Sequence, residues 1–132
     1  MHGSCLCGHV KFEIQTPFIS SSICHCQQCQ KSHAASHVAY GATLKSDVIW
    51  LEGKKRIKKY LSSERAKRGF CKDCGTNIYF FNKDYPNHLD IPLSILDTDA
   101  NLAPQCHVFV ASKAKWDTIS DDLPQYEGSY SF

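Results

Sequence analysis

Short runs in which hydrophobic and polar residues alternate are the main pattern along this chain. In the first run, Val10, Phe12 and Ile14 are separated by single polar residues, which is the period of a β-strand with one buried face. Comparable runs follow at residues 37–40, 48–51, 57–61, 77–81, 88–96 and 107–111. Turn-forming residues bound each run. The pattern therefore predicts a mainly β fold of antiparallel strands.

Helical periodicity is nearly absent, since the polar segment 27–35 predicts one helical turn at most. With 132 residues and no internal repeat, the chain has the length of one domain, and we expect residues 1–132 to form it. The first residues lack the features of a signal peptide, and no hydrophobic run approaches the roughly 20 residues that span a bilayer. We therefore expect a soluble, cytoplasmic protein without membrane contact.

Eight cysteines add a candidate chemistry to this fold. Disulfides are rare in a reducing compartment, so clustered thiols are interpreted as metal ligands. Three of them fall within Cys24-His25-Cys26-Gln27-Gln28-Cys29. Zinc is the predicted metal, because it binds thiolate sulfur and prefers four tetrahedral ligands. His25 points away from its two neighbours in an extended segment, so we expect it to form a hydrogen bond beside the site rather than to bind metal.

The other cysteine motifs are two pairs, Cys5-Leu6-Cys7-Gly8 and Cys71-Lys72-Asp73-Cys74-Gly75. A glycine follows the second cysteine in both, where it allows the positive φ that turns backbone N–H groups toward sulfur. This shared feature predicts that the pairs form one closed site of four thiolates, which would stabilise the fold. Spacing alone leaves other partitions open, because the triplet could take Cys71, Cys74 or Cys106 as a ligand.

The way in which the cysteines divide between the two sites decides the chemistry of the triplet. If the two pairs use all their sulfurs, Cys106 is the only cysteine left, and an isolated cysteine is usually a small buried hydrophobic residue. We therefore predict a site of three cysteines, Cys24, Cys26 and Cys29, with one open position. A thiol that binds there would lose its proton below its ordinary pKa, which makes thiol chemistry the expected function.

Charge is unevenly distributed, although the formal net charge is only +2. Eight of the fifteen basic residues lie between Lys54 and Arg68. We interpret this segment as solvated strand faces rather than as a nucleic-acid surface, and a small anionic ligand is the other partner that it suggests. Arg56, Lys58, Arg65 and Arg68 could meet the carboxylates of a small thiol, but solvated side chains are the expected outcome.

Several of these motifs occur together, and in the same order, in a known family. They are Ser4-Cys5-Leu6-Cys7-Gly8, Cys24-His25-Cys26-Gln27-Gln28-Cys29-Gln30-Lys31, Phe70-Cys71-Lys72-Asp73-Cys74-Gly75-Thr76, His107-Val108-Phe109-Val110, Trp116 and Asp122-Leu123-Pro124-Gln125-Tyr126-Glu127. Through them the chain resembles the glutathione-dependent formaldehyde-activating enzyme family, which also includes centromere protein V.

The resemblance implies a β-tent fold, in which several small coiled antiparallel sheets are joined by zinc. It also implies two ions per chain, a structural zinc on Cys5, Cys7, Cys71 and Cys74 and a second zinc on Cys24, Cys26 and Cys29. The activity that it implies is the condensation of glutathione with formaldehyde to S-(hydroxymethyl)glutathione, classed in reverse as a carbon–sulfur lyase reaction.

We therefore expect an enzyme that acts on a small thiol such as glutathione and a small aldehyde, with Cys24, Cys26 and Cys29 as ligands of the open zinc. The alternative is a non-catalytic, zinc-stabilised module that binds nucleic acid or a protein.

Three smaller expectations concern individual residues. The family usually reads Lys-Ser-Ser-Gly after the triplet, whereas this chain has Lys31-Ser32-His33-Ala34-Ala35-Ser36, and the missing glycine is expected to alter the backbone beside the open position. Trp50 and Trp116 are expected to close the core. His107 is expected to be a hydrogen-bonded strand histidine.

Overall fold

The computed structural model describes residues 1–130, and the fold is mainly β, as the alternating pattern predicted. The described residues contain one α-helix, α1 (Gln27–His33), together with ten strands. The strands are β1 (His2–Ser4), β2 (Lys11–Ile14), β3 (Ser20–Cys24), β4 (Val38–Leu44), β5 (Val48–Glu52), β6 (Ile57–Leu61), β7 (Ala66–Cys71), β8 (Asn77–Asn82), β9 (His88–Pro92) and β10 (His107–Val108). Short 3₁₀ turns lie at Lys45–Asp47, Lys54–Arg56, Leu93–Ile95 and Val110–Ser112.

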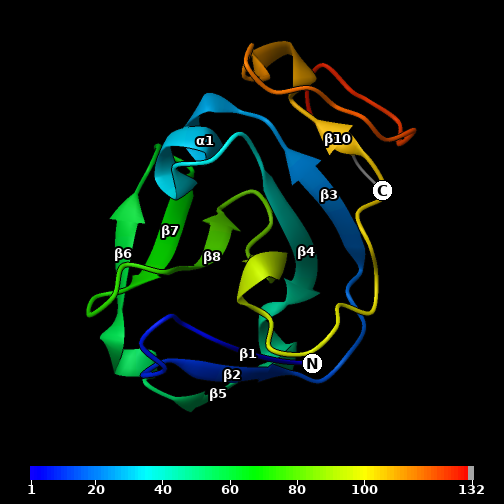
Figure 1. Ribbon diagram of the computed structural model, residues 1–132. Helices are drawn as coiled ribbons and strands as arrows, with labels where there is room; N and C mark the ends of the chain where they lie inside the picture. The colour runs from blue at the N-terminus through cyan, green and yellow to red at the C-terminus, as the bar shows by residue number, and fades with distance from the viewer. Residues whose placement is uncertain (131–132) are drawn as a thin grey trace.

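The strands form two sheets. Strands β1, β2 and β5 make a three-stranded antiparallel sheet, and the others make a seven-stranded sheet in the order β10-β3-β4-β9-β8-β7-β6. Within the larger sheet only β10 and β3 are parallel. Figure 1 shows that this sheet curls, so that β6 and β3 stand on opposite sides and the small sheet lies across one end. The curl gives the large sheet an inner face, toward the small sheet, and an opposite face.

The main core lies on the inner face, between the two sheets. Phe12 and Ile14 of β2, Ile78 of β8 and Ile91 of β9 are at most 1 % exposed there. Trp50 of β5 packs edge-on against Phe12, with ring centroids 5.8 Å apart. Burial of these side chains removes a large hydrophobic area from water, which is the dominant stabilising term in folding. The expected position of Trp50 at the core is confirmed.

Trp116 does not close the core, which corrects the expectation from the sequence. Its side chain is 77 % exposed. The C-terminal segment instead follows β10 through backbone hydrogen bonds, from the N–H of His107 to the carbonyl of Pro124 at 2.8 Å and from the N–H of Tyr126 to the carbonyl of His107 at 2.9 Å. Tyr126, rather than Trp116, packs against a second cluster of buried residues around the cysteine triplet.

Three strands, β1, β3 and β7, were not predicted because their sequences do not alternate. Strand β3 begins with three serines. Ser21 is buried, and its hydroxyl is satisfied there because it donates to the carbonyl of Tyr40 at 3.0 Å. Two predicted runs end early. The run predicted over residues 88–96 ends as a strand at Pro92 and continues as a 3₁₀ turn. The run predicted over residues 107–111 ends as a strand at Val108, because Phe109 has φ +56°.

Helix α1 is seven residues long. Within residues 1–130, no helix has the length and hydrophobicity that a membrane span requires. Cys26 caps its N-terminus, with the sulfur accepting from the N–H of Cys29 at 3.3 Å. At its C-terminus Ala34 adopts the left-handed conformation, with φ +50° and ψ +47°. Ala34 stands where the resembling family has glycine, and a residue with a Cβ atom adopts this conformation at a steric cost of roughly 1–2 kcal/mol.

Replacement of Ala34 by glycine should therefore stabilise the protein. The relief of steric strain exceeds the added entropy of the unfolded chain, which costs about 0.4–1 kcal/mol, so the expected gain is about 0.5 kcal/mol by chemical denaturation. Ala35→Gly is the matched control, because Ala35 has no positive φ and the same substitution should lower stability by about 0.4–1 kcal/mol. Equal effects of the two substitutions would show that Ala34 is unstrained.

Candidate metal centres

The structure gathers seven of the eight cysteines into the two groups that the motifs predicted. The first group contains Cys5, Cys7, Cys71 and Cys74, and all four sulfurs lie within 4.8 Å of one another. The sulfurs of Cys5 and Cys7 are 3.5 Å apart, and those of Cys7 and Cys71 are 3.9 Å apart. Four convergent sulfurs supply the complete ligand set of a tetrahedral site for a soft metal ion.

Two glycine turns position this four-cysteine group. Gly8 has φ +78° and Gly75 has φ +80°, a conformation that side chains other than glycine rarely adopt. The N–H of Gly8 donates to the carbonyl of Cys5 at 3.0 Å, and that of Gly75 donates to the carbonyl of Cys71 at 2.8 Å. The glycine signal in the sequence therefore corresponds to two matching turns, one from each half of the site.

The second group contains Cys24, Cys26 and Cys29, whose sulfurs also lie within 4.8 Å of one another. Cys24 ends β3, Cys26 caps α1 and Cys29 lies in the first turn of that helix. Among residues 1–130, no further cysteine, histidine or carboxylate joins this group at that distance. Hydrogen bonds among the three sulfurs lower the pKa of Cys26 and raise the pKa of Cys24, so they favour the thiolate at Cys26.

Arg68 contacts the triplet, which the sequence did not predict. It lies on β7, is only 5 % exposed, and its Nη2 is 3.6 Å from the sulfur of Cys29. Its Nη1 donates to the hydroxyl of Tyr40 at 3.3 Å, and its guanidinium lies 5.0 Å from the ring centroid of Phe80. The expectation that Arg68 is solvated is wrong, because alternation along β7 turns this side chain toward the helix.

A carboxylate and a phenol complete the surroundings of Cys29. Burial, together with the charge of Cys29, raises the pKa of Asp90 to about 7. Burial and the same charge also raise the pKa of Tyr40, whose hydroxyl is 3.7 Å from the sulfur of Cys29 and 3.1 Å from Nε2 of His33. Sequence reasoning missed Tyr40, His33 and Asp90, because they come from three different elements and carry no motif.

His25 is not part of the metal-binding group. Its Nε2 is hydrogen-bonded to Nδ1 of His107 at 2.8 Å, and Nε2 of His107 lies 3.0 Å from both carboxylate oxygens of Asp121. Both histidines are buried, at 0 % and 3 % exposure. The expectations for His25 and His107, hydrogen bonding rather than ligation, agree with this arrangement.

Cys106 lies near the triplet without joining it. It is 2 % exposed and belongs to the same buried cluster as Cys24 and Cys29, but its sulfur is not among the convergent ones. Burial raises the pKa of its thiol. Cys106 therefore behaves as the small buried residue that an isolated cysteine usually is.

The other arginines named from the sequence lie at the surface. Arg56 is paired with Asp73 at 2.6 Å, and Arg65 is paired with Asp84. All four side chains are at least partly solvated, and exposed pairs of this kind contribute little to stability. The expectation of solvated side chains is confirmed for these two arginines.

Comparison with known proteins identifies the family. The model of the glutathione-dependent formaldehyde-activating enzyme family matches residues 1–112. The chain belongs to this family. Homologues are named as a lyase or as a formaldehyde-activating enzyme, and the cysteine clusters of this chain are suited to metal.

Two curated relatives and one solved structure are similar to this family member. An uncharacterized lyase of Schizosaccharomyces pombe is 40 % identical over 80 residues, which cover 59 % of this chain and 55 % of the relative. A putative glutathione-dependent formaldehyde-activating enzyme of Halomonas elongata is 24 % identical over 123 residues, covering 88 % of this chain and 78 % of the relative. The crystal structure of a Rhodobacter sphaeroides protein has the same fold, with a TM-score of 0.60 and 23 % identity over 76 % of this chain and 92 % of that one.

Loss of one sulfur from the four-cysteine group should destabilise the whole fold. Cys71 is fully buried at the end of β7, and Cys71→Ser should remove one metal equivalent and lower the melting temperature by about 10 °C or more. Elemental analysis and calorimetry measure the two effects. A variant that keeps both its metal content and its melting temperature would contradict a structural role for this group.

Loss of one sulfur from the triplet should spare the fold. Serine is a favoured N-cap residue, so Cys26→Ser keeps the cap of α1 while removing a soft ligand. The expected result is one fewer metal equivalent and a melting temperature within about 3 °C of the parent. Equal destabilisation by Cys26→Ser and Cys71→Ser would show that the two groups do not differ in role.

Proposed function

We propose that the chain holds two zinc ions, one on each cysteine group, and that the triplet is the active site of a carbon–sulfur lyase. The thiol substrate is glutathione and the aldehyde is formaldehyde, in accordance with the family description. The observation that carries the proposal is the difference between the groups, because one offers four sulfurs and the other only three. Zinc prefers four ligands, so three from the protein leave a position for a substrate.

The donor set of the triplet fits zinc. All three donors are cysteine sulfurs, which select soft or borderline metals over magnesium and calcium. Three thiolates and one Zn²⁺ carry a net charge of −1, which the buried guanidinium of Arg68 would balance at 3.6 Å from the sulfur of Cys29. A zinc ion there would supply a cation that lowers the pKa of an incoming thiol.

The proposed reaction joins a thiol to an aldehyde. The thiol sulfur attacks the carbonyl carbon, a carbon–sulfur bond forms and the π bond of the carbonyl breaks. The thiol releases its proton and the carbonyl oxygen takes one up, so the product is a hydroxymethyl thioether and no oxidant is required. The reverse reaction breaks the carbon–sulfur bond and returns both substrates.

Arg68 and Tyr40 would orient the site rather than react. Arg68 donates to the sulfur of Cys29 and to the hydroxyl of Tyr40. Its guanidinium lies over the ring of Phe80. These contacts fix the position of the Cys29 sulfur and limit its access to water. Outer contacts of this kind typically contribute 10–100-fold to metal affinity or activity.

The proposed activity can be measured as exchange between glutathione and S-(hydroxymethyl)glutathione by NMR. The zinc-loaded protein should raise the exchange rate above the spontaneous one, and Cys26→Ser should return it to that background while the fold persists. An exchange rate that the parent protein leaves unchanged would remove this assignment.

Substitution of Arg68 tests its role beside the triplet. Arg68→Gln should weaken retention of the second zinc, or slow exchange, by about 10–100-fold, while Arg68→Lys should lose less because it keeps the charge. Chelator competition measures the first effect and NMR the second. Arg65→Gln is the control, since this exposed arginine pairs with Asp84 and should change neither. Parent-like zinc retention and exchange in Arg68→Gln would contradict the proposed role.

A further inference from the structure

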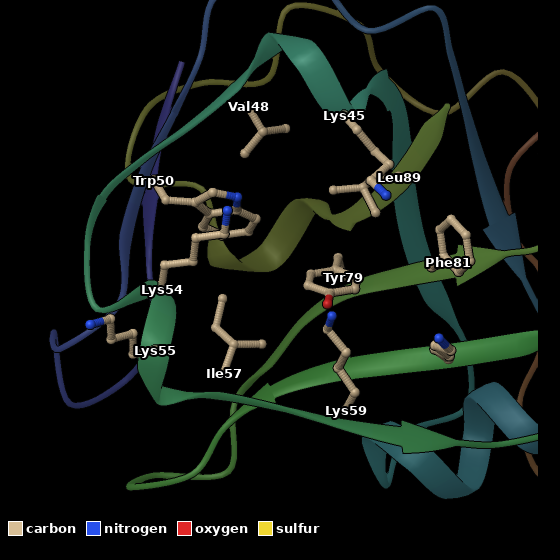
Figure 2. A pocket seen from close by; sticks show the side chains of 11 residues that line it. Lys45, Val48, Trp50, Lys54, Lys55, Ile57, Lys59, Tyr79, Phe81 and Leu89 are labelled. Carbon is tan, nitrogen blue, oxygen red and sulfur yellow. The ribbon is translucent and has the colours of Figure 1, made fainter. Parts of the chain in front are cut away.

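A cavity that the metal centres do not use lies on the inner face of the large sheet. This cavity, of about 590 Å³, opens between β5 and the strands β6, β7, β8 and β9 (Figure 2). We call it the lysine cavity. Its lining residues are Lys45, Val48, Trp50, Lys54, Lys55, Ile57, Lys59, Lys67, Tyr79, Phe81 and Leu89. This volume is in the range of pockets that hold small molecules and cofactors.

The lysine cavity and the cysteine triplet lie on opposite faces of the same strands. Side chains alternate along a strand, and on β7 Arg68 faces the triplet while Lys67 lines the cavity. On β8 Phe80 lies beneath Arg68, whereas its neighbours Tyr79 and Phe81 line the cavity. A ligand in the cavity would therefore be separated from the triplet by the sheet, and the proposed thiol chemistry does not use this space.

The cavity carries an uncompensated positive charge. Five of its eleven lining residues are lysines and none is acidic. Within residues 1–130, none of these five lysines forms an ion pair with a carboxylate. Lys45 instead lies 5.0 Å from the ring centroid of Phe81. Like charges around one cavity repel one another, and an anion that bound between them would relieve that repulsion.

The floor of the cavity is aromatic and held in place. The rings of Trp50 and Tyr79 have centroids 6.1 Å apart and are inclined by 54°. Tyr79 lies directly on the backbone of Gly69, where a Cβ atom would come within 2.4 Å of its ring. Figure 2 shows Lys59 extending toward Tyr79, and Lys54 and Trp50 among the side chains that line the cavity. Lysines therefore line the same cavity as aromatic rings against which a planar ring can stack.

We propose that the lysine cavity binds a small polyanion that carries a planar ring, of the chemical class of a nucleoside triphosphate. The lysines would contact the phosphates, and the aromatic floor would receive the base. This inference does not depend on the proposed lyase activity, because the cavity uses neither a cysteine nor Arg68. It also accounts for the basic residues around Lys54 and Lys55, which the metal centres leave unexplained.

Tryptophan fluorescence can test the proposal directly. The chain has two tryptophans, and Trp116 is exposed and does not line the cavity. In a Trp116→Phe background, Trp50 is the single tryptophan and reports on the cavity. Titration of the zinc-loaded protein with ATP should change its emission saturably, with affinity at least about tenfold higher than for adenosine or for tripolyphosphate.

Paired lysine variants show where the ligand binds. Lys59 and Lys67 line the cavity, whereas Lys58 is an exposed neighbour on β6 that does not. Lys59→Ala combined with Lys67→Ala should weaken ATP binding by about tenfold or more, and Lys58→Ala by less than about twofold. Cys26→Ser should leave ATP binding unchanged, which separates this site from the triplet.

Several results would overturn the proposal. Absence of saturable binding would remove the site, and equal affinity for ATP and tripolyphosphate would remove the stacking contact. Equal loss in Lys58→Ala and in the Lys59 and Lys67 double variant would indicate diffuse attraction to surface charge. Binding of single-stranded oligonucleotides that tightens with length and greatly exceeds that of ATP would assign the surface to nucleic acid instead.

Discussion

The meeting of two tight turns at four sulfur atoms is the constraint on which the rest of this fold depends. Residues 5–8 connect the first two strands of the small sheet, and residues 71–75 connect β7 to β8 in the large sheet. Their sulfurs lie within 4.8 Å of one another although the turns are separated by more than sixty residues. The contact fastens one sheet across the end of the other, and the main hydrophobic core lies between them.

Because side chains alternate along β7 and β8, each of these strands contributes residues to two different sites. Neighbouring residues Lys67 and Arg68 lie on opposite faces of one strand, as do Tyr79 and Phe80 on the next. One face presents a guanidinium and an aromatic ring to the cysteine triplet, and the other presents lysines and aromatic rings to a cavity. A shift of register by one residue would exchange the two sets, so strand pairing specifies both sites at once.

The buried charge of Arg68 is the clearest electrostatic feature of the triplet. Burial disfavours a charged guanidinium, yet the hydrogen bond and the charge of Cys29 raise the pKa of Arg68. A buried cation requires a nearby anion, and the cysteine sulfurs are the groups placed to provide it. The triplet and Arg68 are therefore mutually dependent, which explains why an arginine occupies the buried face of an otherwise conventional strand.

The sequence by itself predicted the strand-rich fold and favoured, without deciding it, the division of the cysteines into four and three with Cys106 in neither group. Each of these depends on local spacing, namely alternation of hydrophobic residues, short intervals between cysteines and a glycine after each pair. Only the tertiary structure decided that Arg68 is buried, that Trp116 is exposed and that Tyr40, His33 and Asp90 surround Cys29. Those positions depend on which strands pair and in which register, and such pairings join residues far apart in the chain that no local pattern connects.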